Sequence, residues 1–252
     1  MLETSADTQR REQKELFRRE FIAKRNEIFD HTIPVKFRGA DLNDLQSSPK
    51  SRLSTTDQKA LYEELEQNPL LGYAFFAPAG YSKTTCSYAL FQRAIVENLF
   101  KWWPRQSEYW AWNYKPRRYE YAVPATEWEY RRPRIYVWRK SVPDLLQQHF
   151  TMFNYAGGEN EPEPPQPDIT VEKIEEAVGR GFAPRIFLEE IDKVKLSEFA
   201  INQIFRLLDA VDRHQAQLVM DSNLSRRQFL DLFGEPIYRR IKENCQVKEY
   251  GF

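Results

Sequence analysis

The chain has 252 residues, which is enough to bury one large core or one domain with appendages. Its 37 basic and 37 acidic residues balance, so the total charge favours no class of partner. Two cysteines are too few for a disulfide framework or a zinc site, and they indicate a reducing compartment. No apolar run reaches the roughly 18 residues of a membrane span, and the charged start of the sequence does not resemble a signal peptide. We therefore expect a soluble, cytoplasmic protein without a membrane partner.

The first 30 residues are densely charged and contain neither glycine nor proline. Phe17, Phe21 and Ile28 form an apolar stripe at helical spacing. The stripe predicts either a helix docked on its own domain or a helix that grips another protein. We assign residues 1–31 to a helical, partner-binding arm.

Two segments separate this arm from the first predicted strand. Residues 32–37 predict an extended or turn segment, because Pro34 restrains the residue before it. Residues 55–67 predict a helix that Thr55 or Thr56 can cap.

A degenerate phosphate-binding loop follows the apolar run 73–76 and precedes a helical pattern over 86–100. The usual motif is glycine, four residues, then Gly-Lys-Ser/Thr. Ala77 and Ser82 replace the two glycines of that motif, whereas Lys83 and the threonine after it fit.

The chemistry of such a loop explains these residue types. Backbone N–H groups surround the phosphates of a nucleotide, and the N-terminus of the next helix adds a positive dipole end. Lys83 would reach the β- and γ-phosphates, and the Thr84 hydroxyl would bind magnesium. We thus predict ATP and Mg²⁺ as cofactors; the alternative is an ordinary strand–turn–helix, because Pro-Ala-Gly is a common turn. The predicted nucleotide-binding residues are Pro78, Ala79, Gly80, Tyr81, Ser82, Lys83, Thr84 and Thr85.

Four more strands are predicted beyond the loop, and helical stretches alternate with most of them. This alternation is typical of a parallel sheet covered on both faces, so we predict a three-layer α/β/α domain with five strands. The strands are 135–138, 185–188, 217–220 and 246–250, and the helices are approximately 142–153, 170–180, 197–213 and 225–233.

Two carboxylates end the predicted strand 185–188. In a nucleotide hydrolase the first carboxylate holds the magnesium shell and the second polarises the attacking water. We predict Glu189 as a metal ligand together with Thr84, and Glu190 as the catalytic base. The usual first residue is aspartate, and the extra methylene of glutamate moves the carboxylate outward by about 1.5 Å. The alternative is that both side chains are merely solvated.

Asn223 lies just past the strand 217–220. Its amide both donates and accepts hydrogen bonds, so it can orient water against a phosphate. Asparagine at this place is also a common turn former.

Together these motifs resemble the bacterial AAA+ helicase loaders of the DnaC and IstB type. The resemblance spans about residues 33–250 and depends on the order of the motifs. The stretches that carry it are 33–42, 77–85, 141–146, 186–190, 222–224 and 232–241.

The resemblance implies a P-loop sheet of order 5-1-4-3-2 in a core over residues 32–252, with two interruptions at 101–134 and 157–168. It also implies ATP and Mg²⁺ binding, a homo-oligomer, and a replicative helicase or transposase-like partner on DNA. In such assemblies an arginine of the neighbouring subunit completes the site. Loaders often have that arginine directly after Gly-Glu, where this chain has Pro236, so we assign the role to Arg240. The other options are Arg239, Arg226 and Arg227. We expect no helical lid after the fifth strand.

Ala77, Ser82, Glu189 and Pro236 all depart from the family pattern at catalytic positions. We therefore expect ATP hydrolysis to be weak or absent. The leading hypothesis is a helicase-loader-like ATP-binding protein of DNA replication or mobile-element DNA transactions. The alternatives are a non-hydrolysing adaptor and an IstB-type transposition ATPase.

The segment 101–134 holds five of the six tryptophans. From Lys101 to Lys140 there are ten basic residues and four glutamates, a surplus of six positive charges. Aromatic rings stack on bases and arginines bind phosphates, so the segment predicts a surface for single-stranded DNA. A protein interface and a β-hairpin with cross-strand aromatic pairs are the alternatives. The second interruption, 157–168, is rich in proline and acidic residues and predicts a solvated loop.

Overall fold

The computed structural model describes residues 5–40, 48–107, 110–113, 118–121, 135–155 and 164–252. The chain divides into two compact units. One comprises residues 1–39 and 95–135, and the other comprises residues 40–94 and 136–252.

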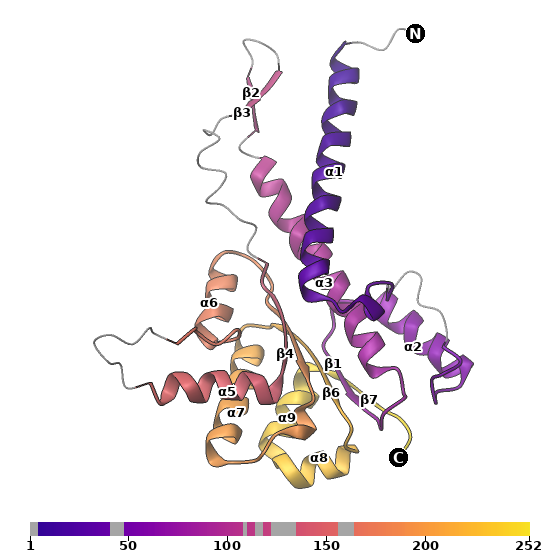
Figure 1. Ribbon diagram of the computed structural model, residues 1–252, viewed down its shortest axis with the longest axis vertical. Helices are drawn as coiled ribbons and strands as arrows, with labels where there is room; N and C mark the ends of the chain where they lie inside the picture. Colours follow the sequence, from indigo (N-terminus) through magenta and orange to yellow (C-terminus); the bar gives the residue numbers. More distant parts are fainter. Residues whose placement is uncertain (1–4, 41–47, 108–109, 114–117, 122–134, 156–163) are drawn as a thin grey trace. The chain divides into compact units, whose positions relative to one another are not determined.

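The larger unit contains a five-stranded, all-parallel sheet (Figure 1). Its order is β4-β5-β6-β1-β7, which is 5-1-4-3-2 when the five strands are numbered along the chain. The predicted fold class and strand order are therefore confirmed. The strands are β1 (Tyr73–Phe76), β4 (Val137–Ser141), β5 (Arg185–Glu189), β6 (Gln217–Ser222) and β7 (Gln246–Glu249).

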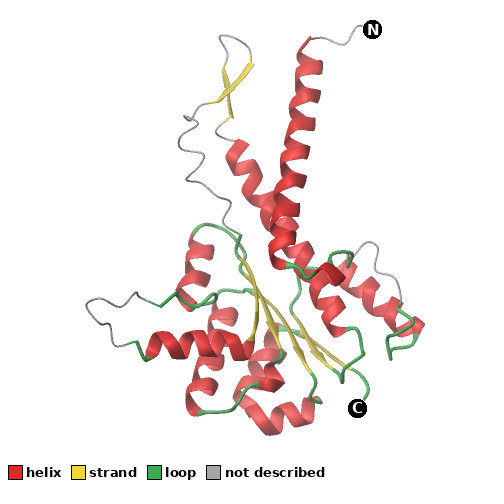
Figure 2. Cartoon of the chain, in the orientation of Figure 1, coloured by secondary structure: helices red, strands yellow, loops and turns green. Residues whose placement is uncertain are grey.

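Helices lie on both sides of this sheet (Figure 2). On one side, Phe76 of β1 and Ile186 of β5 belong to a core cluster with Phe229 and other residues of the helices α5, α7, α8 and α9. On the other side, Phe91 of α3 packs edge-on against Phe187, with ring centroids 5.1 Å apart. Successive strand residues point to opposite faces of the sheet, so Ile186 packs against one helical layer and Phe187 against the other. The helices of this unit are α2 (Thr55–Gln67), α5 (Val142–Phe153), α6 (Val171–Gly179), α7 (Glu198–Arg213), α8 (Arg226–Phe233) and α9 (Glu235–Asn244), with α3 (Lys83–Ser107) beginning here.

The observed helices correct the sequence analysis at two places. Ser54 caps α2, because its hydroxyl accepts from the Asp57 N–H at 3.1 Å, and neither predicted threonine does so. Val35–Phe37 forms a single 3-10 turn, within the segment expected to be extended or a turn. Helix α9 was not predicted at all.

The smaller unit contains α1 (Ser5–Thr32), the last part of α3 and a hairpin of β2 (Trp110–Asn113) and β3 (Arg118–Tyr121). The hairpin is antiparallel, with Trp110 opposite Tyr121. Its backbone agrees with the hairpin that the sequence analysis gave as one alternative for this segment. The side chains that would distinguish a DNA surface from a protein surface lie outside the described residues, as does most of the acidic loop 157–168.

Both cysteines, Cys86 and Cys245, are free and buried. No helix within the described ranges is long and apolar enough to cross a membrane.

Candidate nucleotide-binding site

The loop between β1 and α3 contains two residues in the left-handed conformation that glycine favours, although serine stands at one of them. Gly80 has φ 92° and Ser82 has φ 60°, so both lie in the left-handed region. A serine there costs about 1–2 kcal/mol relative to glycine, which adopts this region freely. The Ser82 hydroxyl donates to the Ser51 hydroxyl at 2.9 Å, which helps to hold the strained residue in place.

Lys83 starts α3, and its side chain turns back onto the loop. Its Nζ donates to the carbonyl of Pro78 at 2.9 Å and to Asn223 Oδ1 at 3.1 Å, and it also contacts the Ala77 carbonyl. The lysine is only 7% exposed. Burial lowers the pKa of Lys83, while the negative charges of Asp221 and Asp192 act in the opposite direction. A buried ammonium group thus lies at the loop, where the sequence analysis expects phosphates.

Asn223 connects this lysine to the segment after β5. Its backbone N–H donates to Asp192 Oδ1 and its Nδ2 donates to Asp192 Oδ2, each at 3.0 Å. This two-point contact leaves Oδ1 of the amide directed at Lys83. The structure therefore brings two of the predicted site residues, Lys83 and Asn223, into direct contact.

The two glutamates at the end of β5 both pair with basic side chains. Glu189 forms an ion pair with Arg139 of β4. Glu190 adopts a left-handed conformation with φ 57° and pairs with Lys193 three residues later. Neither carboxylate is free of a basic partner, which bears on their predicted roles as metal ligand and base.

Asp221 is an acidic residue of this site that the sequence analysis missed. It lies near the end of β6, is 7% exposed, and accepts from the backbone N–H of Glu190 at 3.2 Å. Burial raises the pKa of Asp221 to about 6, and the negative charge of Glu189 adds to this effect. The signal was a charged residue directly after the apolar run 218–220.

Arg52 is a second residue that the sequence analysis missed. Its backbone N–H donates to the Gly80 carbonyl at 2.8 Å. A Cβ on Gly80 would lie 3.4 to 3.5 Å from the Arg52 side chain, so the arginine lies directly against the loop. Arg52 is exposed and adds a positive charge beside the loop. Its position follows from the chain path before α2, which no motif in the sequence indicates.

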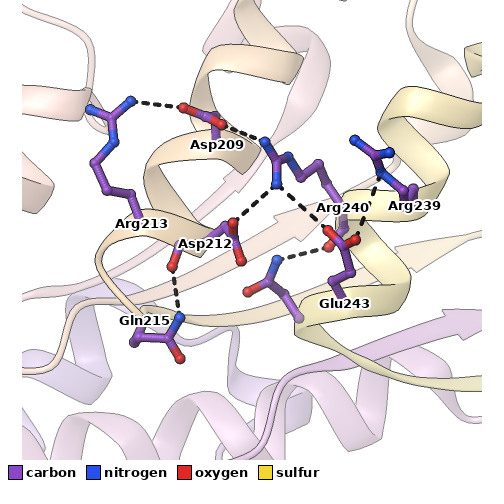
Figure 3. A network of polar contacts seen from close by, with 8 residues as sticks. Asp209, Asp212, Arg213, Gln215, Arg239, Arg240 and Glu243 are labelled. Carbon is purple, nitrogen blue, oxygen red and sulfur yellow. Dashed lines mark hydrogen bonds and ion pairs between the residues drawn. The ribbon is translucent and has the colours of Figure 1, made fainter.

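Arg240, the predicted arginine for a neighbouring subunit's site, is engaged within its own chain (Figure 3). Its guanidinium contacts Asp209 at 2.8 Å, Asp212 at 3.1 Å and Glu243 at 3.6 Å, and it links α9 to α7. The adjacent Arg239 forms an ion pair with Glu243 at 3.7 Å, and its side chain is 60% exposed. A role in a neighbouring site would require Arg240 to leave three carboxylates, so Arg239 is the more available of the two.

A cavity of about 520 Å³ lies elsewhere in the larger unit. It is bounded by α5, α6, α7 and the segment 166–170, and His149 is one of its lining residues. Burial lowers the pKa of His149. No residue of the loop 77–85 lines this cavity, so it is separate from the candidate nucleotide site.

Comparison with known proteins supports the fold. No protein-family model matches the chain, and no curated protein matches its sequence. The structure is similar to the crystal structure of the DnaC helicase loader, with TM-score 0.50, 13% identity, and coverage of 85% of this chain and 98% of that chain. It is also similar to AMPPCP-bound DnaA from Aquifex aeolicus, with TM-score 0.50, 11% identity, and coverage of 86% of this chain and 51% of that chain. At such identities the likeness shows a shared fold, the five-stranded parallel sheet covered by helices.

Proposed function

We propose that the chain binds ATP at residues 78–85. The observation that carries this proposal is Lys83 at the start of α3, with its ammonium on the loop carbonyl of Pro78 and on Asn223. Backbone N–H groups of such a loop and a helix N-terminus favour phosphate, and the lysine and the nearby Arg52 add positive charge. The bound AMPPCP in the similar DnaA structure agrees with a nucleotide at this kind of fold.

We place this ATP binding in DNA replication or mobile-element DNA transactions, in the manner of a helicase loader. The support is the likeness of 85% of this chain to the DnaC helicase loader, 98% of which is matched. The partners that follow are a replicative helicase or transposase-like protein, single-stranded DNA, and further copies of the same chain.

A non-hydrolysing adaptor is the second candidate, and a specific observation favours it. Glu190, the residue expected to activate water, pairs with Lys193, and Glu189 pairs with Arg139. In this arrangement each carboxylate would have to leave its basic partner before it could bind a metal ion or contact an attacking water. We therefore propose weak hydrolysis or none.

Titration of the full chain with ATP tests the nucleotide-binding proposal. Charged hydrogen bonds contribute about 1.5–3 kcal/mol, so Lys83→Ala is expected to weaken binding by about 10- to 100-fold. Lys59→Ala is the matched control, because Lys59 is an exposed lysine of α2. Equal affinity of the wild type and Lys83→Ala would refute the proposed site.

Phosphate release in the presence and absence of single-stranded DNA separates the two candidates. A motor loses DNA-stimulated release in both Lys83→Ala and Glu190→Gln. An adaptor shows no release that either substitution changes.

A further inference from the structure

The carboxylate that the sequence analysis assigns to magnesium is engaged by an arginine of the neighbouring strand. Glu189 ends β5, and its partner Arg139 lies in β4 with a side chain that is only 5% exposed. In the parallel register, Ser141 lies opposite Glu189 and Arg139 lies opposite Phe187. The arginine therefore extends along the strands to reach the carboxylate at the edge where β5 ends.

Contacts with α3 hold the guanidinium of Arg139 in this position. Its Nη1 donates to the Ser87 hydroxyl at 2.8 Å, and its Cζ lies 3.6 Å from the centre of the Tyr88 ring. The ring face attracts the cation, and the hydroxyl fixes the orientation of its plane. A guanidinium with so little exposure requires a counter-charge, and Glu189 supplies it.

This arrangement does not suit a magnesium ion held by Glu189. A metal ion at that carboxylate would have to displace the guanidinium or share the oxygens with it, and the two positive charges would repel each other. Of the two predicted metal ligands, only the Thr84 hydroxyl is without such a conflict.

The ion pair also changes what a triphosphate would encounter. A free carboxylate beside the loop would repel phosphate oxygens unless a metal ion lay between them. Arg139 neutralises Glu189 from within the protein, so the positive charges beside the loop are the ammonium of Lys83 and the guanidinium of Arg52, while Asp221 and Asp192 act on the lysine.

We infer that this site binds a nucleoside triphosphate without a protein-held divalent cation, because Arg139 already neutralises Glu189 and no magnesium ion is needed between that carboxylate and the phosphates. The inference rests on the proposed ATP binding at residues 78–85. It concerns binding, and any metal ion would then be held by the phosphates and water alone.

Calorimetric titration of the full chain with ATP, in excess magnesium and again in EDTA, tests this inference without any substitution. We expect the two affinities to agree within about threefold. A loss of about tenfold or more in EDTA would overturn the inference and leave the proposed nucleotide site standing. Absence of binding in both buffers would instead refute the proposed function.

Glu189→Gln provides a second, independent measurement. The amide still accepts a hydrogen bond from Arg139 but leaves its positive charge uncompensated, so we expect affinity for ATP in both buffers to be unchanged or higher. If Glu189 were a magnesium ligand, its substitution would lower the affinity for ATP by about tenfold in magnesium and leave it constant in EDTA. That result would overturn the inference. Glu176→Gln is the matched control, because Glu176 forms an exposed ion pair with Arg180. Thermal unfolding establishes whether each variant is folded. If Glu189→Gln is not folded, the titration of the wild type in magnesium and in EDTA decides the question.

Discussion

The loop after β1 and the carboxyl end of β5 depart from the nucleotide-hydrolase pattern in opposite ways. The loop lacks two glycines, yet Ser82 adopts the left-handed conformation and Lys83 contacts the loop carbonyls. The end of β5 keeps two acidic residues, yet Glu189 and Glu190 are each paired with a basic side chain. The backbone geometry of the loop is therefore kept although the usual glycines are replaced. The acidic residues of β5 are kept although basic side chains already neutralise them.

The largest expected effect comes from Arg139→Ala at the end of β5. Removing one partner of a buried ion pair costs about 3–5 kcal/mol of unfolding free energy, because the other charge stays buried without compensation. Glu189 is 23% exposed, so the lower end of that range is expected. Urea unfolding measures the change. Arg239→Ala, which breaks an exposed pair with Glu243, is the control and should cost about 0–1 kcal/mol; equal costs for the two variants would contradict a fixed Arg139.

Ser82→Val challenges the loop side of the comparison. A β-branched residue at φ 60° is strained, so the unfolding free energy should fall by about 1–3 kcal/mol. Ser82→Gly relieves the strain but loses the hydrogen bond to Ser51, so it should stay within about 1 kcal/mol of the wild type. Urea unfolding of both variants checks the order. A valine variant as stable as the glycine variant would show that the loop does not hold this conformation.

Asp192→Ala acts on the connection between the two regions. It removes both acceptors of Asn223, and a loss of about 1 kcal/mol of unfolding free energy is expected because water can replace part of the interaction. The amide would then no longer be held toward Lys83. Thermal unfolding measures the loss, with Asp231→Ala on the exposed face of α8 as the control. A change no larger than that of the control would mean that Asp192 does not fix Asn223.

Lys193→Ala is the smallest perturbation and sharpens the contrast within β5. The Lys193–Glu190 pair is exposed on both sides, so the stability of the variant should be indistinguishable from that of the wild type. Salt screens an exposed ion pair of this kind. Because the pair contributes so little, its screening at high salt should not change the stability of the wild type. A clear destabilisation in thermal unfolding would show that Glu190 is held as firmly as Glu189.

Much of the fold could be predicted from sequence because the elements are locally encoded. The apolar runs at β1, β5 and β6 and the helical spacing between them are visible without tertiary information. Helix α9 was missed because Gly-Glu-Pro suggests a turn, whereas in the structure Gly234 with φ 81° precedes the helix and Pro236 lies in its first turn. A proline in that position favours a helix start as well as a turn, and local sequence does not separate the two.

The site was predictable only in part. Lys83 and Asn223 were identified from motifs, and the structure places them in contact. Arg139 was not identified, because its pairing with Glu189 depends on the register between strands 50 residues apart in the chain. Asp192 was missed for the same reason, since its partner Asn223 lies 31 residues further along.

The position of Arg139 in β4 can also be recognised from the amino-acid sequence. It lies two residues before Ser141, the serine whose hydroxyl caps α5. A basic residue at that distance from a capping serine, found together with glutamate where aspartate usually ends the neighbouring strand, could be searched for in other chains of this architecture. It would offer a simple criterion for sorting them by their need for divalent ions before any coordinates are known.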